Sequence, residues 1–139
     1  MSISTVAPLA TCLFDAFNVR DLSVWSSHVA PDAQFSYPGF RARGVEAARA
    51  YNAPFLAAFS DLHFQVHYVL TDGDRSVAKV TGRGTHDGPL VTELGTIAPT
   101  GRWIEVDCLI AVTTRDGQIV QEETYWDRAD MMAQLGTSA

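Results

Sequence analysis

Apolar and polar residues alternate through most of the second half of the chain, and this pattern restricts the possible folds more than any other feature. Successive side chains of a strand point to opposite faces of a sheet, so the alternation indicates half-buried strands. It predicts strands over residues 63–70, 76–86, 102–114 and 119–126. Arg115-Asp116-Gly117 predicts a tight turn between the last two strands. We therefore expect an antiparallel meander in this half of the chain.

The earlier part of the chain carries apolar residues at helical spacing instead. Helices are expected over residues 9–17, 21–29 and 44–60, a short strand over 34–37, and a last helical turn over 130–135. Pro54 should kink the third helix, because proline removes a backbone hydrogen bond. Helices followed by a meander predict an α+β fold, with N-terminal helices packed in the concave face of a strongly curved, mostly antiparallel sheet. Such a cone-shaped barrel leaves a cavity, which is a usual ligand site.

The composition is that of one globular domain, expected to span residues 1–139, with 47% apolar and 19% charged residues. The net charge is −6 and no run of Lys or Arg occurs, which argues against nucleic acid and against an anionic membrane surface as partners. No apolar run approaches the ~18 residues that span a bilayer. The first residues lack the pattern of a signal peptide, so a cytoplasmic location is expected.

The sequence gives little reason to expect a metal site. Cys12 and Cys108 are far apart in apolar surroundings and are expected to be reduced, buried thiols. No CxxC or Cys/His cluster is present. His63 and His67 share one face of a predicted strand, but no third ligand stands at a clear spacing, so solvated or interface histidines are expected.

Five short motifs in the second half are more specific than the composition. They are Gly84-Thr85-His86-Asp87-Gly88, Pro99-Thr100-Gly101-Arg102, Asp116-Gly117-Gln118-Ile119-Val120, Tyr125-Trp126-Asp127 and Gln134-Leu135-Gly136. In this order and spacing the chain resembles the SnoaL-like polyketide cyclase family, the ester-cyclase branch of the nuclear-transport-factor-like fold. The resemblance implies a cone fold and a dimer or higher oligomer formed through the outer sheet face, of which we expect a homodimer. It also implies ring closure of a polyketide by an intramolecular aldol reaction without metal or cofactor. Relatives include hydroxylase-type enzymes, isomerases and proteins of no known activity, so it fixes the fold better than the reaction.

Asp127 is the residue that this resemblance assigns to acid/base chemistry, because the family carries an aspartate near the end of the last strand. Such a carboxylate needs a pKa raised towards neutrality by an apolar site, so that it can take a proton from a carbon next to a carbonyl. The position alone favours another role, since a strand end followed by Arg128-Ala129-Asp130 is where an N-capping aspartate stands. The two roles do not exclude each other.

Strand alternation places Asp127 with Glu123 and Tyr125 on one face, opposite Glu122, Thr124 and Trp126. If Asp127 points into the cone, Glu123 and Tyr125 line it too, and Tyr125 can donate a hydrogen bond to a developing enolate. In the alternative, Glu123 is a surface carboxylate on a solvated sheet face.

His86 and Asp107 are further candidates. His86, in the Gly-Thr-His motif, is either a donor or base at the pocket mouth or a histidine that stabilises a loop through backbone hydrogen bonds. Asp107 faces away from a wholly apolar row and is expected on the outer or dimer face. The substrate is expected to contact aromatic walls, namely Tyr37, Trp25, Tyr51, Phe55 and Phe35. Among these, Tyr37 is the best candidate for a polar contact.

Three functions fit the sequence. The first is a cofactor-free cyclase that acts on a small polyketide-like carbonyl compound. The second is another reaction in the same cone, such as isomerisation, epoxide hydrolysis or opening, or a hydroxylase-type reaction; two carboxylates near one water would favour hydrolysis, and one buried carboxylate cyclisation or isomerisation. The third is a non-catalytic dimer that binds small molecules. A solvent-facing Asp127 that only caps the last helix would weaken the enzyme hypothesis.

Overall fold

The computed structural model describes residues 7–137, and the elements below are those of this part of the chain. The helices are α1 (Ala7–Asn18), α2 (Ser23–Ser26), α3 (Val45–Ala58) and α4 (Arg128–Gln134). The strands are β1 (Val29–Tyr37), β2 (Phe40–Arg43), β3 (His63–Asp72), β4 (Arg75–Thr85), β5 (Leu90–Thr92), β6 (Gly95–Ile97), β7 (Trp103–Arg115) and β8 (Gln118–Trp126).

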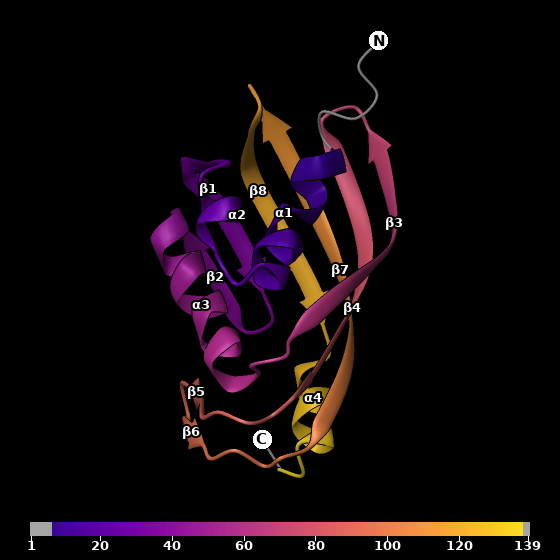
Figure 1. The fold of residues 1–139 in the computed structure, drawn as a ribbon. Helices are drawn as coiled ribbons and strands as arrows, with labels where there is room; N and C mark the ends of the chain where they lie inside the picture. The colour runs from indigo at the N-terminus through magenta and orange to yellow at the C-terminus, as the bar shows by residue number, and fades with distance from the viewer. Residues whose placement is uncertain (1–6, 138–139) are drawn as a thin grey trace.

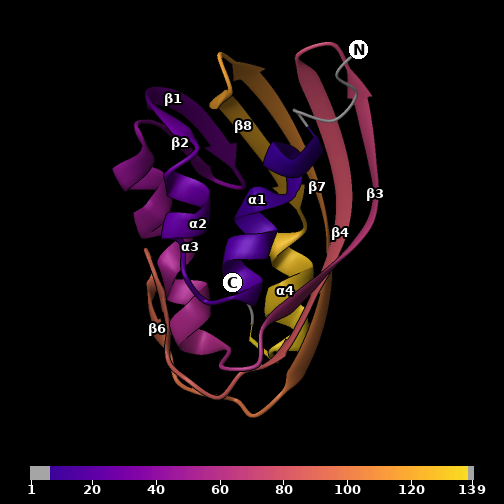
Figure 2. The ribbon, with the colours of Figure 1, turned by 45° about the horizontal axis from the view of Figure 1, so that its top comes forward.

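One curved sheet in the order β2-β1-β8-β7-β4-β3 forms the wall of the molecule (Figure 1). Every neighbouring pair in it is antiparallel except β1 and β8, which run parallel. This one parallel pair places a strand from the first third of the chain beside the last strand. Helices α1, α2 and α3 lie on the concave side (Figure 2). The predicted α+β fold with a mostly antiparallel, curved sheet is therefore confirmed.

The four strands predicted from alternation are present within one or two residues. In β7 the burial alternates along most of its length, and the predicted apolar row faces the core, with Ile104, Val106, Cys108, Ile110 and Val112 all buried. Each such side chain contributes about 1.5–3 kcal/mol by leaving water. The inner surface of the sheet therefore forms the floor of the core.

Two local predictions were wrong. The second helix is only Ser23–Ser26, and β1 already begins at Val29, where a helix end was expected. β2 and the β5–β6 hairpin were not predicted, because strands of four and three residues are too short for alternation to be visible. Helix α3 continues through Pro54 to Ala58, in agreement with the predicted range of 44–60, and the kink at Pro54 stays a prediction.

The loop after β4 is held against the end of α3. The backbone N–H groups of Asp87 and Gly88 both donate to the carbonyl oxygen of Ala58, at 3.1 and 3.0 Å. A Cβ atom on Gly88 would lie 2.1 Å from the carbonyl oxygen of Ala57, so only glycine fits here. This close approach fixes where α3 stands relative to the sheet.

Candidate functional site

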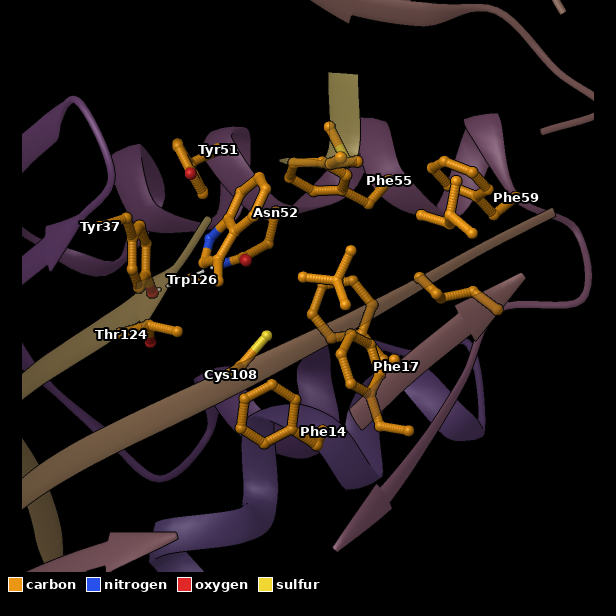
Figure 3. Close-up of a pocket in the computed structure, with 16 residues that line it drawn as sticks. Phe14, Phe17, Tyr37, Tyr51, Asn52, Phe55, Phe59, Cys108, Thr124 and Trp126 are labelled. Atoms are coloured by element: carbon orange, nitrogen blue, oxygen red, sulfur yellow. Dashed lines mark hydrogen bonds between the residues drawn. The ribbon is translucent and has the colours of Figure 1, made fainter. Parts of the chain in front are cut away.

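A cavity lies between α1, α3 and the concave face of the sheet (Figure 3). Its volume is about 70 Å³, below the roughly 300–1,000 Å³ that is usual for pockets that hold drug-sized ligands. Its walls are mainly aromatic and aliphatic, and none of the lining residues that the structure describes is Asp, Glu, Lys, Arg or His. The lining therefore suits a flat, neutral ligand.

Three polar side chains gather at one end of the cavity, which we call the polar end: Tyr37 from β1, Asn52 from α3 and Thr124 from β8 (Figure 3). Asn52 Nδ2 donates to the Tyr37 hydroxyl at 3.3 Å and to the carbonyl oxygen of Ala48 at 2.9 Å. Thr124 Oγ1 is buried and has no hydrogen-bond partner among the described residues. Among the lining residues that the structure describes, Thr124 at the polar end thus has an unused hydrogen-bonding group.

Behind the polar end lies Glu122, whose side chain is fully buried. The Tyr37 hydroxyl donates to Oε2 at 2.6 Å, and Trp25 Nε1 donates to Oε1 at 2.9 Å. The two ion pairs within residues 7–137 involve other carboxylates, so Glu122 has no cationic partner there. Burial raises the pKa of Glu122 to about 7. The two hydrogen bonds lower the pKa, but their effect is smaller than that of burial.

The pairing of strands explains why Glu122 is inside. It stands opposite Phe35 on β1 and Val112 on β7, both of which face the core. Burial, and then the charge of Glu122, raise the pKa of Tyr37, which therefore remains a phenol. When Glu122 is ionised, Tyr37 donates to it; when Glu122 is protonated, it can donate to Tyr37, whose own O–H then becomes available to a ligand. The pair can thus move a proton between the cavity and a buried store.

Asp127 lies outside this arrangement. Its Oδ1 accepts a hydrogen bond from the backbone N–H of Asp130 at 2.9 Å, as the N-cap of α4, and the residue is exposed. It is not among the residues that line the cavity. The capping role expected from its position is confirmed, whereas its role in chemistry stays a prediction.

Glu123 and Tyr125 lie on the outer face of the sheet, where the Tyr125 hydroxyl donates to Glu123 at 3.1 Å and 58% of Tyr125 is exposed. The sequence placed them in the cavity only on the condition that Asp127 points into it. The structure does not bring them there, and for Glu123 it agrees with the alternative of a surface carboxylate. That expectation extended the alternation of β8 to Asp127, but the strand ends at Trp126 and the chain turns there into α4. Within β8 the side chains that point inward are Glu122, Thr124 and Trp126, which the alternation placed on the face opposite Glu123 and Tyr125.

His86 is buried beneath the loop that follows β4 and is not among the cavity's lining residues. Its backbone N–H donates to Arg102, and its Nδ1 accepts from the backbone N–H of Thr100 at 3.1 Å. Burial lowers the pKa of His86, so the ring is neutral at pH 7. This arrangement agrees with the loop-stabilising alternative. The ring packs against Phe59, which lines the cavity, with 5.4 Å between the ring centroids.

Of the expected aromatic walls, Tyr37, Tyr51 and Phe55 line the cavity. Trp25 and Phe35 are buried in the layer behind it, and Trp25 holds Glu122 instead of a ligand. The polar end was missed apart from Tyr37. The sequence feature that could have indicated this site is Glu122, an acidic residue in a row of β8 that otherwise faces inward. Glu is almost never fully buried without a partner, so such a position points to buried polar partners nearby.

The remaining polar candidates lie apart from the cavity. Asp107 is on the outer face, as expected, and accepts from Thr81 Oγ1 at 2.6 Å, which also contacts His67 Nε2 at 2.6 Å. No group of three metal-ligating side chains occurs among residues 7–137. Cys12 and Cys108 are free and buried, as expected, and burial raises the pKa of both thiols to about 12. No helix in the described part of the chain is both long and apolar enough to cross a membrane.

Solved structures with the same fold cover nearly the whole chain. A candidate polyketide cyclase from Streptomyces antibioticus is 30% identical, with a TM-score of 0.78 over 97% of this chain and 100% of that one. A candidate SnoaL-like polyketide cyclase from Jannaschia sp. CCS1 is 23% identical, with a TM-score of 0.83 over 98% and 94%. A candidate hydroxylase from Streptomyces galilaeus is 22% identical, with a TM-score of 0.80 over 97% and 98%.

No curated protein sequence matches the chain. The family model described as SnoaL-like polyketide cyclase, however, matches residues 8–135, which include every residue that lines the cavity. On the strength of this match, the chain belongs to the SnoaL-like polyketide cyclase family.

Proposed function

We propose that the protein is a cofactor-free cyclase that acts on a small polyketide-like carbonyl compound by acid/base, aldol-type ring closure. Tyr37 exchanges protons with the substrate, and Glu122 stores the proton behind it. One observation carries the proposal: a fully buried carboxyl without a cationic partner is joined through a single 2.6 Å hydrogen bond to the polar end of an aromatic cavity.

The reaction starts with Glu122 ionised. The Tyr37 oxygen takes a proton from the carbon next to a carbonyl while the Tyr37 hydroxyl proton passes to Glu122, and an enolate forms. The enolate carbon then forms a bond to a second carbonyl carbon of the same molecule, whose oxygen becomes an alkoxide. Tyr37 protonates the alkoxide and regains a proton from Glu122, so the enzyme returns to its starting state and the product is an isomer of the substrate.

The number of carboxyl groups favours this chemistry over hydrolysis of an epoxide. Hydrolysis needs a second carboxylate near the water, and the described lining of the cavity holds none, with only Glu122 behind it. Isomerisation of an enone needs the same two proton transfers as cyclisation and is the nearest alternative. The similar hydroxylase from Streptomyces galilaeus is below 25% identity and supports only the shared fold.

Proton exchange at carbon tests the proposal without knowledge of the natural substrate. The probe is 2-tetralone, a flat neutral ketone, and the measurement is incorporation of deuterium next to its carbonyl, followed by NMR in D2O. The wild-type protein should accelerate exchange, and the rate should rise through about pH 7 as Glu122 ionises. Glu122→Gln and Tyr37→Phe should each lower the acceleration by about two to four decades.

Asp127→Asn is the matched comparison, because it removes the charge of the residue that the family resemblance assigns. We expect exchange close to the wild-type rate in this variant. Loss of exchange in Asp127→Asn, with exchange retained in Glu122→Gln, would transfer the acid/base role to Asp127. Binding of 2-tetralone to the wild-type protein without any acceleration would leave the non-catalytic binding function.

The assembly and location belong to the same proposal. We propose a homodimer formed through the outer face of the sheet, where Tyr68, Leu70, Leu109 and Tyr125 are all at least 43% exposed. Exposed apolar side chains in a contiguous group are typical of protein interfaces. The two unpaired cysteines in the core support a cytoplasmic location.

A further inference from the structure

The hydrogen-bonding capacity of Asn52 at the polar end is fixed by its neighbours. Both hydrogens of Nδ2 are committed, one to the Ala48 carbonyl oxygen and one to the Tyr37 hydroxyl. The Ala48 carbonyl only accepts, so the amide group cannot rotate by half a turn without losing that bond. Asn52 therefore offers a ligand its Oδ1 atom, which only accepts.

Thr124 supplies the complementary group. Its hydroxyl can donate or accept, the residue is 5% exposed and is one of those that line the cavity, and Oγ1 is a buried atom with no partner among the described residues. Buried polar atoms without a partner are uncommon in folded proteins because each one lacks the hydrogen bond it had in water. A ligand that gives Thr124 a partner restores that bond.

We infer that Asn52 and Thr124 select a neutral ligand through a hydroxyl group, phenolic or enolic, that donates to Asn52 Oδ1 and accepts from Thr124 Oγ1. The oxygen of a ketone or an ester cannot form a hydrogen bond with Asn52 Oδ1, because both oxygen atoms are acceptors. A carboxylate would bring a negative charge into a cavity whose described lining contains no cation and which has Glu122 behind it.

This inference rests on the proposed function for the use of the cavity as the substrate site, and it adds the form in which the substrate is held. The enol of the substrate, or the hydroxyl that ring closure creates, occupies the polar end. The keto form lacks the donor that Asn52 requires. Asn52 and Thr124 are then specificity-determining residues, distinct from the pair that moves the proton.

Equilibrium binding of 2-naphthol and its methyl ether, 2-methoxynaphthalene, tests the inference by NMR titration of the folded protein. The two probes share the flat aromatic part and differ in the hydroxyl donor. The wild-type protein should bind 2-naphthol about tenfold more tightly than the ether, the effect of one net hydrogen bond. The anion 2-naphthoate should bind more weakly than 2-naphthol.

Thr124→Val removes only the hydroxyl, at nearly constant volume, and Thr124→Ser retains it. Because Oγ1 has no partner in the protein itself, Thr124→Val should keep the thermal stability of the wild type, which a structural hydroxyl would not allow. It should lose most of the preference for 2-naphthol, and Thr124→Ser should keep it. Equal binding of the two probes by the wild type, or an unchanged preference in Thr124→Val, would overturn the inference.

These outcomes are separate from those of the deuterium-exchange experiment, because binding needs no turnover. If Glu122→Gln exchanges as fast as the wild type while Thr124→Val loses the hydroxyl preference, the proton relay fails and the recognition of the hydroxyl stands. If Glu122→Gln loses the exchange activity while Thr124→Val keeps the preference for 2-naphthol, the recognition of the hydroxyl group is rejected and the proton relay stands.

Discussion

Burial of Glu122 has an energetic consequence that extends beyond the reaction. An ionised carboxylate inside a protein is unfavourable unless hydrogen bonds or a cation stabilise it, and here Tyr37 and Trp25 supply two hydrogen bonds and no cation. The carboxyl is thus close to balance between its charged and neutral forms at neutral pH. A group so balanced can both take and return a proton, which a fully stabilised carboxylate cannot do.

The stability of the protein should therefore depend on pH through Glu122. The folded state holds a proton on this carboxyl up to about pH 7, whereas the unfolded chain releases it near the ordinary value of 4.5. The contribution of Glu122 to stability is complete below the lower value and is lost as the pH rises through the higher one. The loss amounts to about 3 kcal/mol.

Urea unfolding at a series of pH values from about 5 to about 8 measures this effect. Glu122→Gln lacks the titration, so its free energy of unfolding relative to the wild type should increase up to about pH 7 and level off above it, where the wild-type carboxyl is ionised in both states. Subtracting the two curves removes the contributions of all other titrating groups. A difference that stays constant with pH would mean that Glu122 is ionised in the folded state throughout.

The sequence could have predicted Glu122 but not its partners. Alternation along β8 correctly separated Glu122 from Glu123, and it left open which row faces the core. The motif ending in Asp127 drew attention to the wrong row, because the turn after Trp126 breaks the alternation. The contacts of Trp25 and Tyr37 with Glu122 join residues 97 and 85 positions apart in the chain, and no local pattern encodes such pairing.

At the scale of elements, most long strands were predictable and short ones were not. β1, nine residues long, was predicted only over 34–37, because Pro31-Asp32 is typical of the end of a helix. β3, β4, β7 and β8 each have at least nine residues, enough for their alternation to stand out. The pairing of β1 with β8 was not predictable, because two parallel strands are not joined by a tight turn and no local sequence motif therefore marks them as neighbours. The cavity depends on this pair, since Tyr37 and Thr124 come from its two strands.

Two glycines should respond differently to alanine because different neighbours occupy the space for a Cβ. At Gly88 the obstacle is the backbone oxygen of Ala57 at 2.1 Å, and at Gly82 it is the ring of Phe64 at 2.6 Å. Gly88→Ala should lower the free energy of unfolding by about 1–3 kcal/mol, as overpacking does. Gly82→Ala should turn the Phe64 ring into the cavity and weaken binding of 2-naphthol, with a smaller loss of stability.

Thermal unfolding and NMR titration of both variants make the comparison. Equal stability losses in the two proteins, with unchanged binding in each, would contradict the assignment of a rigid neighbour to Gly88 and a movable one to Gly82.

At the scale of the whole molecule, the two faces of the sheet have separate tasks. The inner face carries the cavity, and the outer face carries a cross-strand row formed by Tyr68, Lys79, Leu109 and Tyr125, which are successive pairing partners across β3, β4, β7 and β8. Side chains on the two faces point in opposite directions, so a change on one should leave the other intact.

The proposed dimer can be tested on this row. Leu109→Arg places a charge in the centre of the outer face and should convert a wild-type dimer into a monomer in sedimentation velocity experiments. Val19→Arg, at a site 62% exposed just after α1, is the matched control and should remain a dimer. Binding of 2-naphthol should be unchanged in both. A wild-type protein that sediments as a monomer at micromolar concentration would exclude this assembly.

The parallel pairing of β1 with β8 also bears on how the chain acquires its structure during synthesis. The ribosome releases α1, β1 and α3 long before β8. Trp25 and Tyr37 therefore lack their hydrogen-bond partner, the carboxyl group of Glu122, until β8 emerges. Contacts between distant segments form late and slow the search for the native state. The sheet of the nascent chain is thus expected to remain incomplete, with the edges of β1 and β7 that pair with β8 uncovered, until β8 has been made. Insertion of β8 between them would then complete the sheet and create the proton store in one event.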